Sequence, residues 1–160
     1  MERIEKKFVL NRQEFLKTSQ ELKLKPTFPS RIVKSIYFDT HDLKYFYDSE
    51  EGITPRIKVR RRGYNSKPLT NLEIKKSNNY SREKIVKKNT NFNKIIFKSF
   101  LRDNKINHNL EEKILVIYNR TYFTCTKFSR ITFDTDIKFF SVKKYYAVHL
   151  YGMQYFKLQI

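Results

Sequence analysis

Four basic side chains stand at every second position of one short segment, and they make it the part of the chain best suited to binding an anion. They are Arg56, Lys58, Arg60 and Arg62. In an extended strand such side chains share one face at a spacing of about 7 Å. Like charges at that spacing repel one another unless water or a strongly negative partner lies opposite. Three of the four are Arg, whose guanidinium group can hold a phosphate through two parallel hydrogen bonds.

The composition of the whole chain agrees with a negatively charged partner. Its 160 residues include 34 Lys and Arg against 16 Asp and Glu, which gives a formal net charge of +18. This balance favours nucleic acid, an anionic membrane surface or a chain of phosphates as the ligand. Because aromatic residues make up 16% of the chain, we expect a packed fold and not a disordered basic tail. The length predicts a single domain over residues 1–160.

Signals for covalent catalysis, export or membrane insertion are missing from the sequence. Cys125 is the only cysteine, and the three histidines lie far apart without the spacing of metal ligands. No apolar stretch approaches the roughly 20 residues that a membrane-spanning helix needs, and the first ten residues lack a signal-peptide core. We therefore expect a cytoplasmic protein.

The hydrophobic pattern predicts a mainly antiparallel α+β fold. Helices are expected over residues 11–23, 41–48 and 91–101, the first beginning with a capping box formed by Asn11 and Glu14. Amphipathic strands are expected over residues 3–8, 56–62, 72–75, 117–122 and 130–137. Aromatic residues of strands usually lie in the core, so that position is predicted for Tyr37, Phe38, Phe123 and Phe133. Asp39 is predicted to be a turn or cap residue.

Carboxylates occur in phase with the cations on these strands. Glu5, Glu73, Asp134 and Asp136 would share a face with basic side chains, as a site for a metal ion and phosphate requires. The pattern fits two architectures. One is an open sheet whose charged face meets water, and the other is a closed barrel with a polar lumen.

Six segments in order along the chain resemble the VTC domain, the polyphosphate-polymerase branch of the CYTH-like triphosphate tunnel metalloenzymes. They are RIEKKF at 3–8, SIYFDT at 35–40, RIKVRRRGY at 56–64, LEIKK at 72–76, VIYNRTYF at 116–123 and RITFDTDI at 130–137. The resemblance implies an antiparallel barrel of eight strands with helices packed outside. It also implies a lumen that binds polyphosphate, triphosphate or a nucleoside triphosphate.

The resemblance assigns roles to thirteen positions of this sequence. Phosphoryl transfer onto a growing polyphosphate would use cations to neutralise developing charge, with Mn²⁺ or Mg²⁺ bridging phosphate oxygens. The implied catalytic residues are Arg60, Arg62, Lys75 and Arg120; the substrate-binding residues are Lys7, Arg56, Lys58, Lys84 and Arg130; the metal ligands are Glu5, Glu73, Asp134 and Asp136. Two alternatives stay open here: Glu5 could pair with a cation, and Asp134 and Asp136 could each pair with Arg120 or Arg130.

The C-terminal part departs from the family pattern. Members of the family continue to a strand with a second E-x-K motif, but no Glu follows Glu112 here, and residues 138–160 are atypical. We therefore expect a C-terminally truncated or degenerate member with an incomplete barrel, in which polymer synthesis is uncertain. The alternatives are hydrolysis of triphosphate, a domain that only binds, or a partner chain that completes the barrel. A nucleic-acid-binding β domain, with aromatic side chains stacking on bases, is also open.

Overall fold

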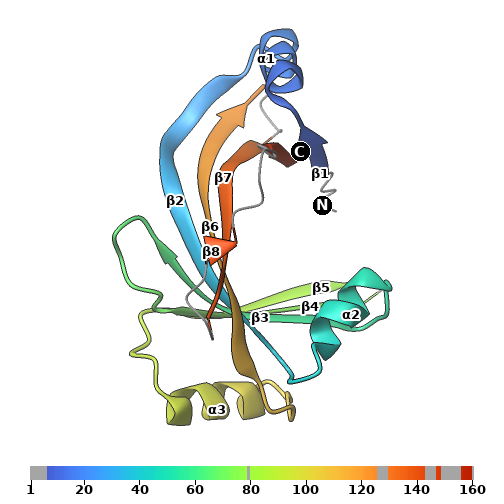
Figure 1. Cartoon of the computed structure of the whole chain (residues 1–160), viewed down its shortest axis with the longest axis vertical. Helices are drawn as coiled ribbons and strands as arrows, with labels where there is room; N and C mark the ends of the chain where they lie inside the picture. The colour runs from blue at the N-terminus through green and yellow to red at the C-terminus, as the bar shows by residue number, and fades with distance from the viewer. Residues whose placement is uncertain (1–6, 79, 126–129, 143–146, 149–155, 160) are drawn as a thin grey trace.

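The computed structural model describes residues 7–78, 80–125 and 130–142, together with the backbone of residues 147–148 and 156–159 (Figure 1). In these residues strands dominate and helices interrupt them, as the sequence predicts. The strands are β1 (Lys7–Leu10), β2 (Lys25–Asp39), β3 (Arg56–Tyr64), β4 (Asn71–Ser77), β5 (Arg82–Lys87), β6 (Glu111–Thr124), β7 (Ile131–Ser141), β8 (Ala147–Val148) and β9 (Phe156–Gln159). The helices are α1 (Arg12–Glu21), α2 (Lys44–Glu50) and α3 (Lys94–Asp103).

All strand pairs of the sheet are antiparallel, and the sheet curls without closing. The order is β1-β9-β7-β6-β2-β3-β4-β5, with β8 paired to β7. In the part of the chain that the structure describes, no ladder joins β1 to β5, so these two strands are the edges. Figure 1 shows the two edges on the same side of the molecule, with an opening between them. The predicted α+β class and the incomplete barrel are both confirmed.

The atypical tail contributes a strand beside β7. Residues 156–159 pair with β1 on one side and with residues 132–134 on the other, which places residue 157 opposite Asp134. A strand therefore occupies this place although the tail has no Glu.

Side-chain caps fix where the helices begin. Asn11 and Glu14 form the predicted capping box of α1. Asn93 caps α3, which starts three residues later than predicted. Helix α2 also starts later, because Leu43 adopts a left-handed conformation with φ of 61°. Asp39 accepts hydrogen bonds from the backbone N–H groups of Tyr45 and Phe46, both at 2.9 Å, which confirms its predicted role as a turn or cap residue.

The core lies on the side of the sheet that faces away from the opening. Helix α3 packs its buried face against Phe38, Val59, Leu72 and Ile74 of the central strands. A second, smaller cluster joins α1 to β7 through Ile131 and Phe133. Because neighbouring residues of a strand face opposite sides, this packing leaves the alternate positions, including Arg60 and Arg62, on the side of the opening.

Gly63 allows a loop to cross β3 at backbone distance. A Cβ atom at this position would lie 2.6 Å from the carbonyl oxygen of Pro68 and 3.0 Å from that of Lys67. Both contacts are with backbone, so the strand or the loop must shift. We expect Gly63→Ala to lower the free energy of unfolding by about 1–3 kcal/mol, as overpacking does, measured by thermal or denaturant unfolding. The exposed Ser66→Ala is the control, and an equal effect of both would contradict the steric explanation.

Candidate anion-binding site

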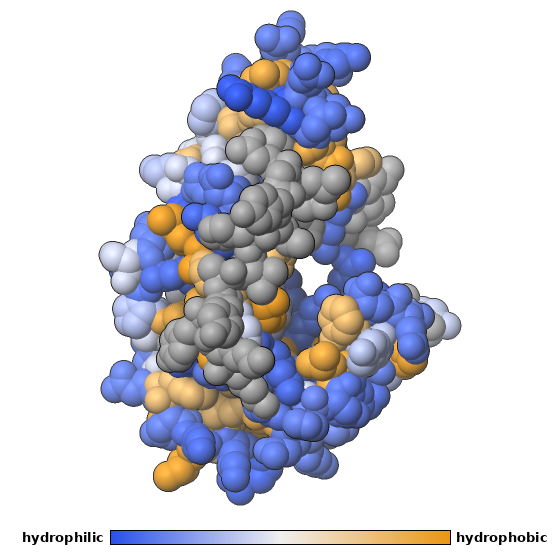
Figure 2. All heavy atoms as spheres, in the orientation of Figure 1, coloured by the Kyte–Doolittle hydropathy of each residue, from blue (hydrophilic) through white to orange (hydrophobic). Residues whose placement is uncertain are grey.

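A cavity of about 470 Å³ opens on the concave side of the sheet, between the β3–β5 strands, β1 and α2. Seven of its ten lining residues are Lys or Arg, and one is Glu. The lining residues are Lys7, Ser49, Arg56, Lys58, Lys75, Lys76, Ser77, Arg82, Glu83 and Lys84. In Figure 2 the molecule is hollowed between the part that carries β1 and the part that carries α2, and hydrophilic side chains border much of this hollow.

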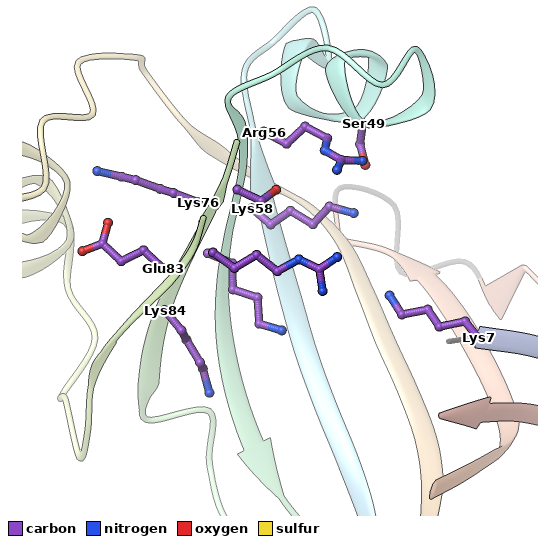
Figure 3. A pocket seen from close by; sticks show the side chains of 10 residues that line it. Lys7, Ser49, Arg56, Lys58, Lys76, Glu83 and Lys84 are labelled. Atoms are coloured by element: carbon purple, nitrogen blue, oxygen red, sulfur yellow. The ribbon is translucent and has the colours of Figure 1, made fainter. Parts of the chain in front are cut away.

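Alternation along β4 and β5 divides these side chains between the two faces of the sheet. Lys7 reaches into the cavity from β1 and Lys58 from β3, whereas Lys76 and Glu83 point the other way (Figure 3). Lys76 donates to the carbonyl oxygen of Asn104 at 2.7 Å, on the α3 side. The only carboxylate of the lining therefore does not neutralise the cations that face the cavity.

Three cations of the cavity have no counter-ion among the residues that the structure describes. In residues 7–78, 80–125 and 130–142, no carboxylate forms an ion pair with Arg56, Lys58 or Arg82. The Nε atom of Arg56 is buried without a hydrogen-bond partner. Uncompensated cations around one concave space raise its positive potential and attract anions to it.

Deeper on the same face, Arg60 is held by an ion pair. Its Nε donates to Glu73 Oε2 at 2.7 Å, and its Nη1 donates to the hydroxyl oxygen of Tyr37 at 3.0 Å. The other oxygen of Glu73 accepts from Lys84 at 3.1 Å. Arg60 and Glu73 are 8% and 3% exposed, so the pair is largely removed from water.

Burial and charge act in opposite directions on this cluster. Burial disfavours the carboxylate of Glu73, but Arg60, Arg62 and Lys84 outweigh it and hold the pKa of Glu73 below its ordinary value. Burial likewise opposes ionisation of Tyr37, yet Arg60 and the neighbouring cations lower the pKa of Tyr37. Both shifts report a strongly positive environment, which is what a bound anion would meet.

Two more arginines continue the row of cations along the concave face. Arg62 donates from Nε to the Ser35 hydroxyl oxygen at 3.0 Å. Arg120 forms a bidentate pair with Asp134, with both N···O distances 2.6 Å. Burial opposes the charged form of Arg120, but the hydrogen bonds to Asp134 prevail and raise its pKa. Arg62 is 8% exposed and forms no ion pair with a carboxylate in the part of the chain that the structure describes.

The structure brings most of the predicted site residues to one face, in two groups. Five of them line the cavity, namely Lys7, Arg56, Lys58, Lys75 and Lys84. The deeper part of the face is formed by Arg60, Arg62, Glu73 and Asp134, which are buried, and by Arg120, which is half-buried. Arg130 is exposed just before β7. Glu5 lies outside the described residues.

Asp136 departs from the predicted alternation. Asn119 pairs with Thr135 and Ile117 with Lys138, so β7 has an extra residue here. Asp136 has φ of 52° at this irregularity, is exposed, and accepts from the Thr135 hydroxyl at 3.2 Å. A bulge changes the direction in which a side chain points, so Asp136 does not follow the alternation of β7. The alternation of polar and apolar residues in the sequence did not reveal this bulge.

The sequence did not identify Arg82 and Ser49 as lining residues. Tyr37, predicted for the core, is half-buried, and its hydroxyl oxygen accepts from Arg60. Arg82 stands two positions before Lys84 on the same strand, so the period of two could have identified it. Ser49 comes from α2, whose position beside β3 no local pattern specifies. Phe38 and Phe133 are in the core as predicted, at 4% and 1% exposure.

The carboxylates described by the structure do not fit the predicted metal site. In the described residues, no three His, Cys, Asp or Glu side chains lie close enough together to hold a metal ion. Glu73 and Asp134 each use both oxygens in bonds to cations. The arrangement presents donors to a ligand where a metal centre would present acceptors.

A family model and solved structures resemble this chain. The model of the VTC domain matches residues 2–151. A "putative adenylate cyclase" from Bacillus halodurans is 13% identical with a TM-score of 0.58, covering 98% of this chain and 78% of the other. The PH1819 protein of Pyrococcus horikoshii OT3 is 15% identical with a TM-score of 0.55, covering 98% and 76%. No curated protein matches. No helix in the described part is long and apolar enough to cross a membrane.

Proposed function

This chain belongs to the VTC domain family, and on that basis we propose that its concave cavity binds a chain of linked phosphates. The ligand class comprises polyphosphate, tripolyphosphate and the triphosphate of a nucleotide. The observation that carries the proposal is the cavity itself, whose lining includes seven Lys or Arg residues and one Glu. Phosphate oxygens accept charge-assisted hydrogen bonds from both side-chain types.

The composition of the lining favours a phosphate chain over single-stranded nucleic acid. Proteins that bind single strands combine a basic groove with aromatic side chains on which bases stack. None of the ten lining residues is aromatic. As far as the structure describes the chain, the cavity therefore offers contacts for phosphate groups and no stacking platform.

Phosphoryl transfer onto a growing polyphosphate is the finer activity that we propose for the same face. Arg60, Arg62 and Arg120 lie along the row of cations beyond the cavity, where they would neutralise charge that develops on a transferred group. To test phosphoryl transfer, the protein is incubated with ATP in the presence of either Mn²⁺ or EDTA, and polyphosphate is then detected on a gel. Release of orthophosphate without polymer would indicate hydrolysis, and no turnover would indicate a domain that only binds.

Binding is tested by calorimetric titration with tripolyphosphate. We expect Lys58→Gln/Arg82→Gln to weaken the affinity by about 100-fold, since each charge-assisted contact contributes about tenfold. Both side chains are exposed and without ion pairs in the described residues, so their loss should leave the fold intact. The control is Lys98→Gln/Arg102→Gln on α3, which removes the same charge from the other side of the sheet.

The two ligand classes are separated by competition. If a phosphate chain is the ligand, tripolyphosphate should bind tightly by itself. If nucleic acid is the ligand, tripolyphosphate should displace little or no labelled oligonucleotide from the protein. Equal affinity loss in the cavity variant and in the α3 control would show that only the overall charge matters and would contradict the proposed site.

A further inference from the structure

We propose that this domain holds its phosphate ligand through Lys and Arg side chains alone, without a divalent metal ion between protein and phosphate. The inference rests on the proposed phosphate-chain binding and concerns how that site neutralises charge. It departs from the expectation raised by the family resemblance. Its basis is the state of the two buried carboxylates on the concave face, Glu73 and Asp134.

Both oxygens of Glu73 are already held by cations of the protein. Its Oε2 accepts from Arg60 at 2.7 Å and its Oε1 from Lys84 at 3.1 Å. Register fixes this arrangement, because Arg60 and Glu73 are direct partners in the β3–β4 ladder. A metal ion that took the carboxylate would leave a buried guanidinium without its partner, which is strongly unfavourable.

Asp134 is engaged in the same way. Both of its oxygens accept from Arg120 at 2.6 Å, and these residues are direct partners in the β6–β7 ladder. The bidentate geometry satisfies the carboxylate in the plane that a metal ion would need. Each buried carboxylate therefore serves to hold an arginine in place on the concave face.

Among the described residues, further oxygen ligands are scarce along this face; Glu5 lies outside them. Asp136, the other predicted ligand of β7, is exposed at the bulge, and no Glu occurs after Glu112 in the sequence. Ca²⁺ needs six or more oxygen ligands, and Mg²⁺ requires near-ideal octahedral coordination. The described part of the chain offers no group of three candidate ligands.

The cations can perform the neutralising role that a metal ion has in other phosphate sites. Arg56, Lys58 and Arg82 face the cavity without ion pairs in the residues that the structure describes. Ammonium and guanidinium groups donate several hydrogen bonds each and accept none, so they can contact successive phosphates directly. A metal-bound phosphate would be less negative and would gain less from these contacts.

The test compares tripolyphosphate binding by calorimetry in EDTA and with equimolar Mn²⁺. We expect the affinity in EDTA to equal or exceed that with Mn²⁺, and Lys58→Gln/Arg82→Gln to weaken it in EDTA. In parallel, electron paramagnetic resonance of Mn²⁺ mixed with the protein alone should show only free ion. Affinity about tenfold or more higher with Mn²⁺, or a protein-bound Mn²⁺ signal that Glu73→Gln removes, would overturn the inference and leave the proposed function standing. Absence of binding under both conditions would overturn the proposed function itself.

Discussion

Replacing Glu73 with alanine is expected to lower the free energy of unfolding by about 3–5 kcal/mol, the range found when one partner of a buried ion pair is removed. Glu73 is 3% exposed and accepts from both Arg60 and Lys84. Without it, the Tyr37 hydroxyl is the one hydrogen-bond partner that Arg60 keeps among the described residues, and two cations remain close together. Denaturant unfolding followed by circular dichroism measures the change.

Glu83→Ala is the matched control for this substitution. Glu83 lies on the adjacent strand β5 but is exposed and points to the other face. Exposed substitutions usually change stability by less than about 0.5 kcal/mol. A similar loss in both variants would mean that Glu73 contributes no more than a surface charge.

The same residue makes stability depend on pH. The pKa of Glu73 is lower in the folded chain than in an unfolded one, since the neighbouring cations outweigh burial. Its contribution is therefore complete above the ordinary glutamate pKa of about 4.3 and is lost as the pH falls through the lower, folded value. The stability difference between the native chain and Glu73→Gln should be constant near neutral pH and shrink in acid. A difference that grows on acidification would contradict the assigned direction.

Replacing Phe133 with alanine is expected to cost about 3–5 kcal/mol of folding free energy, as for other buried phenylalanines. Phe133 is 1% exposed, and its ring forms T-shaped contacts with Phe15 and Phe123, at 4.4 Å and 5.5 Å between ring centroids. The small cluster that joins α1 to β7 is built around this ring. Its loss would also loosen the strand that positions Asp134.

Phe46→Ala provides the comparison for this variant. Phe46 is 52% exposed on α2, so the same truncation removes little buried area and should cost much less. Thermal unfolding of both variants gives the answer. Equal effects would show that the Phe133 cluster adds nothing specific to stability.

Local patterns predicted the elements of this fold better than their ends. The period of two along residues 56–62 identified β3 and its charged face, and the apolar spacing of residues 91–101 identified α3. Helix starts were less accurate because side-chain caps decide them. Asp39 caps α2 from six and seven residues away, and Leu43 adopts positive φ, which spacing of apolar residues does not encode.

The site was predictable to the extent that it follows strand alternation. Lys58, Lys75 and Lys84 are ladder neighbours on adjacent strands, so a period of two places them together once the strands pair. Alternation does not specify which residues stand opposite each other on neighbouring strands. The ladders place Glu73 opposite Arg60 and Asp134 opposite Arg120, and only the second pair was among the alternatives left open by the sequence. In the structure both carboxylates, predicted as metal ligands, accept hydrogen bonds from arginine.

Lys7 is the single lining residue that comes from β1, whereas the others come from α2 and β3–β5. The two edge strands, β1 and β5, have no ladder between them in the described residues. A phosphate chain in the cavity would therefore be contacted from both sides of the gap between these edges. Such a ligand would act as a non-covalent clasp between the first strand and the middle of the chain. Hydrogen exchange of the β1 amides should then slow on adding tripolyphosphate, as local opening becomes coupled to ligand release.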